Sequence, residues 1–307
     1  MRNFISISDI DKNDLRSIIN NAKSQKENRS KLDKSAIDSN APLKDKILIM
    51  IFEKSSTRTR LSFELAIKQL GGEFLALNPK ESHYGSGDES IHDTAKVLSQ
   101  YGDIVMMRTS DHEHFLEFSK HLDIPIINGL TSLSHPCQIM SDIMTFEELK
   151  GPIRNKKIAW LGDGNNVLYS LIEAAVQFEF QLSIACPKGY EPDKKILQWA
   201  KKNNGSILIT KNPLEASNNA DCVITDKWIS MGDKINKNKK KNALKPYQVN
   251  KKIMKSAKKD SIFMHCLPAN RGEEVTNDVM DGKQSAVWLE ALNRIHAQKS
   301  IIEWCLK

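Results

Sequence analysis

The chain has 307 residues, of which 40% are hydrophobic and 27% are charged, and its formal net charge is +7. At about 150 residues per domain this length predicts two domains with substantial cores, which excludes a disordered chain and a small disulfide-stabilised one. No apolar run approaches the roughly 20 residues that cross a bilayer, and the first residues lack the apolar segment of a signal peptide, so we expect a globular, cytoplasmic protein.

The excess positive charge lies largely in residues 234–245 and 251–259, without interleaved aromatics or a recognisable nucleic-acid-binding module. We interpret these lysines as a solvated surface and expect neither a nucleic-acid nor a membrane partner. A basic molecule does favour small anionic substrates. The cysteines are odd in number, widely spaced and free of any CxxC, which indicates neither a disulfide framework nor a zinc site. They are Cys137, Cys186, Cys222, Cys266 and Cys305.

Apolar spacing predicts a first helix after Asp11, and the polar stretch 28–42 predicts a connection with a short helix. The apolar run within 46–54 predicts a buried parallel strand, followed by a helix that stops at Gly71-Gly72. Strands and helices then alternate, which predicts a parallel sheet flanked by helices. The expected strands are 74–77, 103–108 and 125–128, and the expected helices are 90–101, 115–121 and 136–150.

A second alternation of strands and helices begins after Gly151-Pro152. We therefore predict an α/β protein of two domains, 1–150 and 151–285, each a parallel sheet flanked by helices. The C-terminal helix, 286–307, carries an apolar stripe and is predicted to pack back on the first domain. The stripe consists of Trp288, Leu292, Ile295 and Ile302. The strands expected in the second domain are 157–161, 182–185, 207–209, 220–225 and 261–264, with helices at 167–178 and 192–203.

Ser56-Thr57-Arg58-Thr59-Arg60 falls on the first turn of the helix that follows the first buried strand. Backbone N–H groups and the positive end of the helix dipole point outward there, hydroxyls add donors, and arginine forks match phosphate oxygens. This combination predicts an oxyanion site without the glycines of a P-loop. The alternative is an ordinary Ser/Thr N-cap with two solvated arginines.

Ligands of open α/β sheets bind beyond the carboxyl ends of the strands, so residues just after strands are the further candidates. Taken singly, each of these candidate residues has a structural alternative. A histidine can begin a helix, an arginine can be a surface charge, an aspartate can stabilise a turn and a cysteine can be a buried thiol. Gly162-x-Gly164 after a strand also resembles a dinucleotide fingerprint, but Val167 replaces its third glycine and no acidic residue ends the next strand, so we exclude nicotinamide binding. The candidates are Arg108, residues 135–138, residues 226–232 and residues 265–268.

Five separated motifs in a fixed order carry a resemblance to a known family. Together they resemble the ornithine carbamoyltransferases of the aspartate/ornithine carbamoyltransferase superfamily over nearly the whole length. The motifs are Phe52-Glu-Lys-Ser-Ser-Thr-Arg-Thr-Arg-Leu-Ser-Phe-Glu64, His135-Pro-Cys-Gln138, Gly162-Asp-Gly-Asn-Asn166, residues 226–232 and His265-Cys-Leu-Pro-Ala269.

The resemblance implies transfer of the carbamoyl group of carbamoyl phosphate to the δ-amine of L-ornithine, giving citrulline and phosphate, without a cofactor or metal. It also implies a homotrimer with sites at subunit interfaces. An enzyme for another amine acceptor, such as putrescine or aspartate, is the nearest alternative. A non-catalytic anion- or nucleic-acid-binding protein is an alternative of a different class.

The resemblance further implies how carbamoyl phosphate is bound. Thr59, Arg108 and His135 would donate to the oxyanion, and the amide oxygen of Gln138 would hold the carbamoyl NH2. His83 stands where the family has Gln, in a loop (81–88) that is one residue longer, and would reach the site of a neighbouring subunit. The implied contacts are Ser56, Thr57, Arg58, Thr59, Arg108, His135, Gln138, Cys266, Leu267 and Arg294, with His83 from that neighbour.

Ornithine would be bound by Asn166, Asp226, Ser230 and Met231. Its amine titrates near pH 10.4, like a lysine, so its deprotonation must be favoured. Cys266 and Asp226 would help to take up the proton, with the leaving phosphate as a competing base, and the family implies a cis bond before Pro268. The catalytic residues implied are thus Arg108, His135, Asp226 and Cys266.

Overall fold

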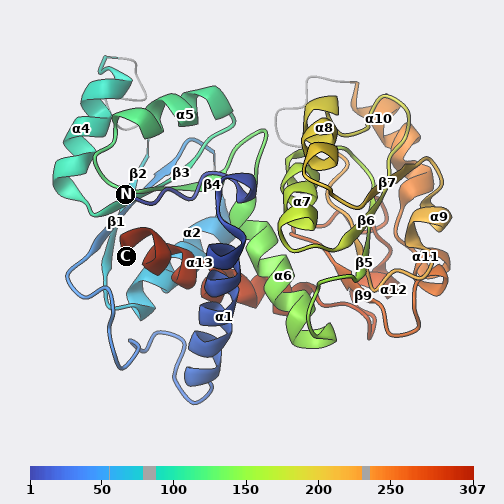
Figure 1. Cartoon of the computed structure of the whole chain (residues 1–307), viewed down its shortest axis with the longest axis horizontal. Helices are drawn as coiled ribbons and strands as arrows, with labels where there is room; N and C mark the ends of the chain where they lie inside the picture. Colours follow the sequence, from blue (N-terminus) through green and yellow to red (C-terminus); the bar gives the residue numbers. More distant parts are fainter. Residues whose placement is uncertain (55, 79–87, 230–235) are drawn as a thin grey trace. The chain divides into compact units, whose positions relative to one another are not determined.

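The structure is a computed structural model that describes residues 1–54, 56–78, 88–229 and 236–307. It divides into two compact units (Figure 1). Unit 1 comprises residues 1–144 and 293–307, and unit 2 comprises residues 145–292. Both units are α/β, and every strand pair in their sheets is parallel, as the alternating pattern predicts.

The sheet of unit 1 has the order β2-β1-β3-β4. Its central strand β1 is buried along its middle four residues, because helices cover a parallel sheet on both faces. The order reverses between β1 and β3, where Phe52 pairs with Arg108 at the carboxyl ends. Such a switch point is where open α/β sheets bind ligands. The strands are β1 (Ile47–Phe52), β2 (Glu73–Leu77), β3 (Ile104–Arg108) and β4 (Ile126–Leu130).

Side-chain caps begin most helices of unit 1. Asp11, Ser56, Ser90 and Asp111 each accept a backbone N–H bond at a helix start. The helices are η1 (Ile7–Asp9), α1 (Lys12–Asn28), α2 (Thr57–Gln69), α4 (Ile91–Tyr101) and α5 (His112–His121), with most of α6 (Pro136–Lys150).

The last helix, α13 (Val287–Leu306), joins unit 1 from Asn293 onward. Ser300 Oγ donates to the carbonyl of Ile18, and Lys26 Nζ donates to Asn293 Oδ1 at 2.8 Å. Figure 1 shows the red end of α13 beside the dark blue α1. The predicted return of the C-terminal helix to the first domain is therefore confirmed. The predicted apolar stripe is wrong in part, since Trp288 is 60% exposed and Leu292 is 45% exposed.

The sheet of unit 2 has the order β7-β6-β5-β8-β9, which reverses between β5 and β8. Its strands are β5 (Lys157–Leu161), β6 (Gln181–Ala185), β7 (Ile207–Thr210), β8 (Cys222–Ile224) and β9 (Ile262–Met264). Its helices are α7 (Asn166–Gln177), α8 (Lys194–Lys202), α9 (Pro213–Ser217), α10 (Lys237–Leu244), η3 (Lys245–Tyr247), α11 (Lys251–Ser256) and α12 (Asn277–Met280). The carboxyl ends of β5, β8 and β9 are neighbours, so residues that follow these strands share one edge of the sheet.

Two local predictions are corrected by the structure. Residues 29–46 contain turns but no helix, because the Arg29 guanidinium binds the carbonyls of Asp33 and Ala36 and holds the segment in an irregular course. The basic stretch after residue 235 is not wholly a solvated surface, since it contains α10 and α10 carries a buried lysine, Lys240, which is 3% exposed.

No helix in the described parts of the chain combines the length and the apolar character that crossing a membrane requires.

Candidate active site

Residues 57–60 form the first turn of α2, at the helix start that the sequence predicts. Ser56 has extended backbone dihedrals, and its Oγ accepts a hydrogen bond from the Thr59 N–H at 3.3 Å. Thr57 is exposed, Arg58 is half-buried and Thr59 is buried. Arg60 is exposed and forms an ion pair with Glu64 one turn along the same helix. The turn therefore offers hydroxyls and Arg58 at the positive end of a helix.

Thr59 is the centre of a network that joins four elements of unit 1. Its Oγ1 accepts hydrogen bonds from Arg108 Nη1 at 3.0 Å and from Arg294 Nη2 at 3.2 Å. Arg294 Nη1 also donates to Gln138 Oε1 at 2.7 Å, and Gln138 Nε2 donates to Asp142 Oδ1 at 2.9 Å. Residues distant in sequence, on α2, β3, α6 and α13, therefore converge at the β1/β3 switch point.

The amide oxygen of Gln138, which the resemblance assigns to the carbamoyl NH2, accepts from Arg294 in this structure. An amide oxygen has two lone pairs and can accept more than one hydrogen bond.

His135 lies directly before α6 and is 4% exposed. Burial holds its pKa well below the ordinary value of 6.5, and the charges of Arg294, Arg108 and Arg58 lower it further. The imidazole is therefore neutral at physiological pH and has one N–H to donate. Its neighbour Cys137 is also buried, and burial raises the pKa of that thiol to about 12. Cys137 is thus an unreactive packing residue.

The arrangement in unit 1 suits an anion with two negative charges. Three guanidiniums, from Arg58, Arg108 and Arg294, are near enough to His135 to depress its pKa. Arginine forks bind phosphate and carboxylate oxygens through charge-assisted hydrogen bonds, and partial burial strengthens these bonds. A neutral imidazole in the same group can donate to a developing oxyanion without adding charge.

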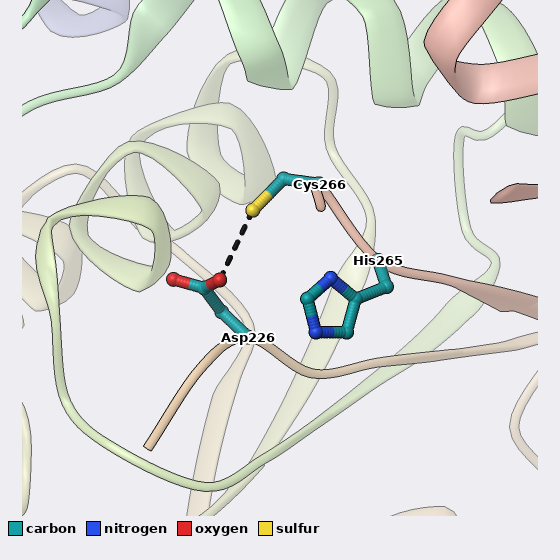
Figure 2. A group of neighbouring side chains, drawn as sticks. All are labelled: Asp226, His265 and Cys266. Carbon is teal, nitrogen blue, oxygen red and sulfur yellow. Dashed lines mark hydrogen bonds between the residues drawn. The ribbon is translucent and has the colours of Figure 1, made fainter. Parts of the chain in front are cut away.

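In unit 2, residues that follow three neighbouring strands meet at one carboxylate. Asp226 follows β8, and its Oδ1 accepts a hydrogen bond from the Cys266 thiol, 3.1 Å away, which follows β9 (Figure 2). Its Oδ2 accepts from Asn165 Nδ2 at 2.7 Å, and Asn165 follows β5. The thiol and the carboxylate are therefore in direct contact, as an arrangement that passes a proton between them requires.

His265 fixes the turn that carries Cys266. Its backbone N–H donates to Glu290 Oε2 at 2.8 Å, and its Nδ1 accepts from the Leu267 N–H at 2.9 Å. Leu267 has φ +57°, a conformation that is costly for a leucine, and this hydrogen bond helps to hold it. The Leu267-Pro268 bond is cis, as the resemblance implies.

Asp226, His265 and Cys266 bring one possible metal-ligand atom each within 4.8 Å of one another (Figure 2). The hydrogen bonds already engage these atoms. His265 Nδ1 accepts from a backbone N–H, its Nε2 lies 3.3 Å from Glu274 Oε1, and the thiol donates to Asp226. These hydrogen bonds explain why the three side chains lie together. That the site binds no metal stays a prediction.

Sequence reasoning missed Asn165, the residue that contacts Asp226. Its Oδ1 caps α7 by accepting from Val167 N and Leu168 N, and this leaves its amide N–H groups for Asp226. The N-cap position of an asparagine before a helix was the available signal. Asn166 is the first residue of α7. Three predicted binding residues, His83, Ser230 and Met231, lie outside the described residues.

The sequence matches two family descriptions that together cover almost the whole chain. Residues 2–148 match the aspartate/ornithine carbamoyltransferase carbamoyl-P binding domain, and residues 154–305 match the Asp/Orn binding domain of the same family. The chain belongs to the aspartate/ornithine carbamoyltransferase family.

Within this family its relatives are ornithine carbamoyltransferases. That of Mesorhizobium japonicum is 49% identical over 100% of this chain and 99% of its own length, and that of Agrobacterium fabrum is 50% identical over 99% and 98%. Among solved structures, ornithine carbamoyltransferase from Pyrococcus furiosus has a TM-score of 0.92 at 42% identity, over 99% of this chain and 97% of that one. The anabolic ornithine carbamoyltransferase of Campylobacter jejuni has a TM-score of 0.91 at 36% identity, over 99% of both chains.

Proposed function

We propose that this protein transfers the carbamoyl group of carbamoyl phosphate to the δ-amine of L-ornithine, giving L-citrulline and phosphate. The observation that carries the proposal is its identity of 49–51% with ornithine carbamoyltransferases over at least 99% of the chain. The residues of the two units supply the chemistry that each substrate requires. Unit 1 presents cations and hydroxyls, and unit 2 presents a carboxylate and a thiol.

Carbamoyl phosphate is bound by the residues of unit 1. The first turn of α2, from Ser56 to Thr59, holds the phosphate, and Arg108 reaches both phosphate and carbonyl oxygen. Thr59, Arg108 and the neutral His135 stabilise the oxyanion of the tetrahedral intermediate, and Gln138 holds the carbamoyl NH2. Positioning and electrostatic stabilisation therefore supply most of the rate enhancement. The buried Arg294, tied to Gln138 and Thr59, supports this site.

Ornithine is bound by residues of unit 2. The carboxylate of Asp226 attracts the cationic end of the substrate, and Asn166 with Ser230 and Met231 completes its recognition. The contact between Cys266 and Asp226 supports a joint role in orienting the δ-amine and receiving its proton. Once deprotonated, the amine attacks the carbamoyl carbon, the C–N bond forms and the C–O bond to phosphate breaks. Leu267 contributes its backbone carbonyl beside the carbamoyl group.

Other acceptors fit the site less well. Aspartate brings an additional carboxylate, which the Asp226 carboxylate repels, and putrescine lacks the α-carboxylate that residues 230–231 would bind. The curated relatives at 48–51% identity are named for ornithine and not for either of these amines.

We place the enzyme in arginine biosynthesis in the cytoplasm, as a homotrimer in which His83 of one subunit reaches the site of the next. The description of the Campylobacter jejuni relative as anabolic supports the metabolic assignment. Two exposed leucines support an interface on unit 1, namely Leu61 on α2 and Leu75 on the edge strand β2, which are 53% and 52% exposed. Exposed apolar side chains on an edge strand favour association.

The function is tested by offering carbamoyl phosphate with ornithine, aspartate and putrescine in separate assays and measuring the ureido product. We expect citrulline from ornithine and little product from the others. Arg58→Ala should keep the fold and lower activity by about a hundredfold, because one charge-assisted contact to the phosphate is lost. Preferred carbamoylation of putrescine or aspartate would contradict the assignment.

A further inference from the structure

One lysine of the basic helix α10 is buried while its neighbours are not. Lys237 and Lys239 are exposed, whereas Lys240 is 3% exposed. Its Nζ donates to Asp163 Oδ2 at 2.7 Å, and the two side chains are only 4% and 11% exposed. A buried ion pair adds little stability over apolar side chains of the same shape, because both charges must leave water. Stability alone is therefore a weak explanation for this pair.

The partner, Asp163, lies in the turn between β5 and α7. Its backbone carbonyl accepts hydrogen bonds from Trp160 Nε1 at 3.1 Å and from the Asn165 N–H at 3.0 Å. Lys240 therefore holds by its side chain a residue whose backbone shapes the turn.

The same lysine also contacts the segment on which this turn packs. Gly164 N donates to the carbonyl of Tyr190 at 2.8 Å, and a Cβ at Gly164 would lie 2.5 Å from the backbone of Glu191. The Lys240 ammonium lies 5.8 Å from the centre of the Tyr190 ring, within the range of a cation–π contact. Lys240 thus links α10 both to the turn between β5 and α7 and to the segment around Tyr190 on which that turn packs.

The turn determines where the side chain of Asn165 points. Its Oδ1 is used by the cap of α7, so its Nδ2 has one direction available, and in that direction it meets Asp226 Oδ2 at 2.7 Å. The other oxygen of Asp226 accepts from Cys266. A continuous series of contacts therefore runs from Lys240 through Asp163 and Asn165 to the carboxylate of the acceptor site.

We propose that Lys240 is a positioning residue for the acceptor amine. By holding Asp163, it fixes the turn so that Asn165 orients the Asp226 carboxylate, and this inference rests on the proposed binding of ornithine by Asp226. Lys240 acts through geometry and does not touch substrate. Its loss should weaken the binding of ornithine far more than that of carbamoyl phosphate, because the series ends at Asp226 and includes none of the carbamoyl phosphate residues of unit 1.

The test is steady-state kinetics of citrulline formation by Lys240→Met, which keeps the aliphatic length and removes the charge. We expect the KM for ornithine to rise about tenfold to a hundredfold, as for other small displacements of a reacting group. The KM for carbamoyl phosphate should stay within about twofold of wild type. Lys240→Arg, which can keep the ion pair, should restore most of the ornithine affinity. Lys239→Met, on the exposed neighbour, is the matched control and should behave as wild type.

A lower unfolding temperature of Lys240→Met with an unchanged KM for ornithine would overturn the proposal, because the pair would then be structural only. If Lys240→Met does not fold, Asp163→Asn takes its place, since it keeps the size and an oxygen acceptor. An unchanged ornithine KM in Asp163→Asn would likewise count against the role. Wild-type protein that forms no citrulline would instead contradict the proposed function itself.

Discussion

The two units gather opposite kinds of charge at parallel sheets of different strand order. Each has a parallel sheet whose strand order reverses, and each gathers its polar residues where the carboxyl ends flank that reversal. In unit 1 the gathered groups are guanidiniums, hydroxyls and a neutral imidazole. In unit 2 they are a carboxylate, a thiol and an amide. The fold thus supplies the location of a site, and the side chains decide which sign of charge it binds.

The largest effect is expected in unit 1, where Arg108→Met removes one of the three guanidiniums near His135. We expect kcat to fall by about 10²- to 10³-fold, because one donor to the phosphate and the developing oxyanion is removed. Arg60→Met is the matched control, since Arg60 is paired with Glu64 and its side chain is 58% exposed. The measurement is citrulline formation at saturating ornithine. Equal losses in the two variants would show that a general loss of positive charge explains the result.

The next effect concerns unit 2 and should be specific for the other substrate. Asp226→Asn keeps the shape of the side chain and removes its charge, so the KM for ornithine should rise by about tenfold to a hundredfold. The KM for carbamoyl phosphate should change little. The two KM values are measured by steady-state kinetics of citrulline formation, with each substrate varied in turn. A rise of the same size in the KM for carbamoyl phosphate would contradict the proposal that unit 2 binds ornithine and unit 1 binds carbamoyl phosphate.

The smallest effect concerns the stability of unit 1, which contains two buried histidines. Burial lowers the pKa of His296 to about 3, and it holds that of His135 well below 6.5. Above pH 6.5 both histidines are neutral in the folded and unfolded states, so stability is fully present there. Below pH 6.5 the unfolded chain binds protons that the folded chain cannot, and stability falls by up to about 1.4 kcal/mol per pH unit for each histidine.

Urea unfolding between pH 7.5 and 5.0 measures this dependence. His296→Gln removes one titrating group and should make the curve less steep between pH 6.5 and 5.0. His92→Gln is the control, because the His92 side chain is 56% exposed. An unaltered slope in His296→Gln would mean that His296 does not contribute to the loss of stability in acid.

Much of the fold could be predicted because its signals are local. Asp11, Ser56 and Ser90 cap helices where the sequence places them, and α6 and β5 have the predicted bounds. The short helices α9, α11 and α12 were not predicted, since four to six residues are too few to show a periodic pattern. The helix expected near residues 28–42 is absent because the guanidinium of Arg29 binds backbone carbonyls of this segment. Such side-chain contacts cannot be predicted from helix propensity.

The sequence by itself determined the α/β class, the return of the last helix and the candidate residues after the strands, because hydrophobic periodicity, capping residues and contiguous motifs are properties of neighbouring positions. Only the tertiary structure decided that Arg294 and Arg108 share the hydroxyl of Thr59, that Asn165 and Cys266 hold Asp226, and that Lys240 is the buried lysine of α10. These contacts join residues tens to hundreds of positions apart. The strand order and the cost of leaving a buried polar group unpaired decide which residues pair in these contacts, and neither can be read from neighbouring positions in the sequence.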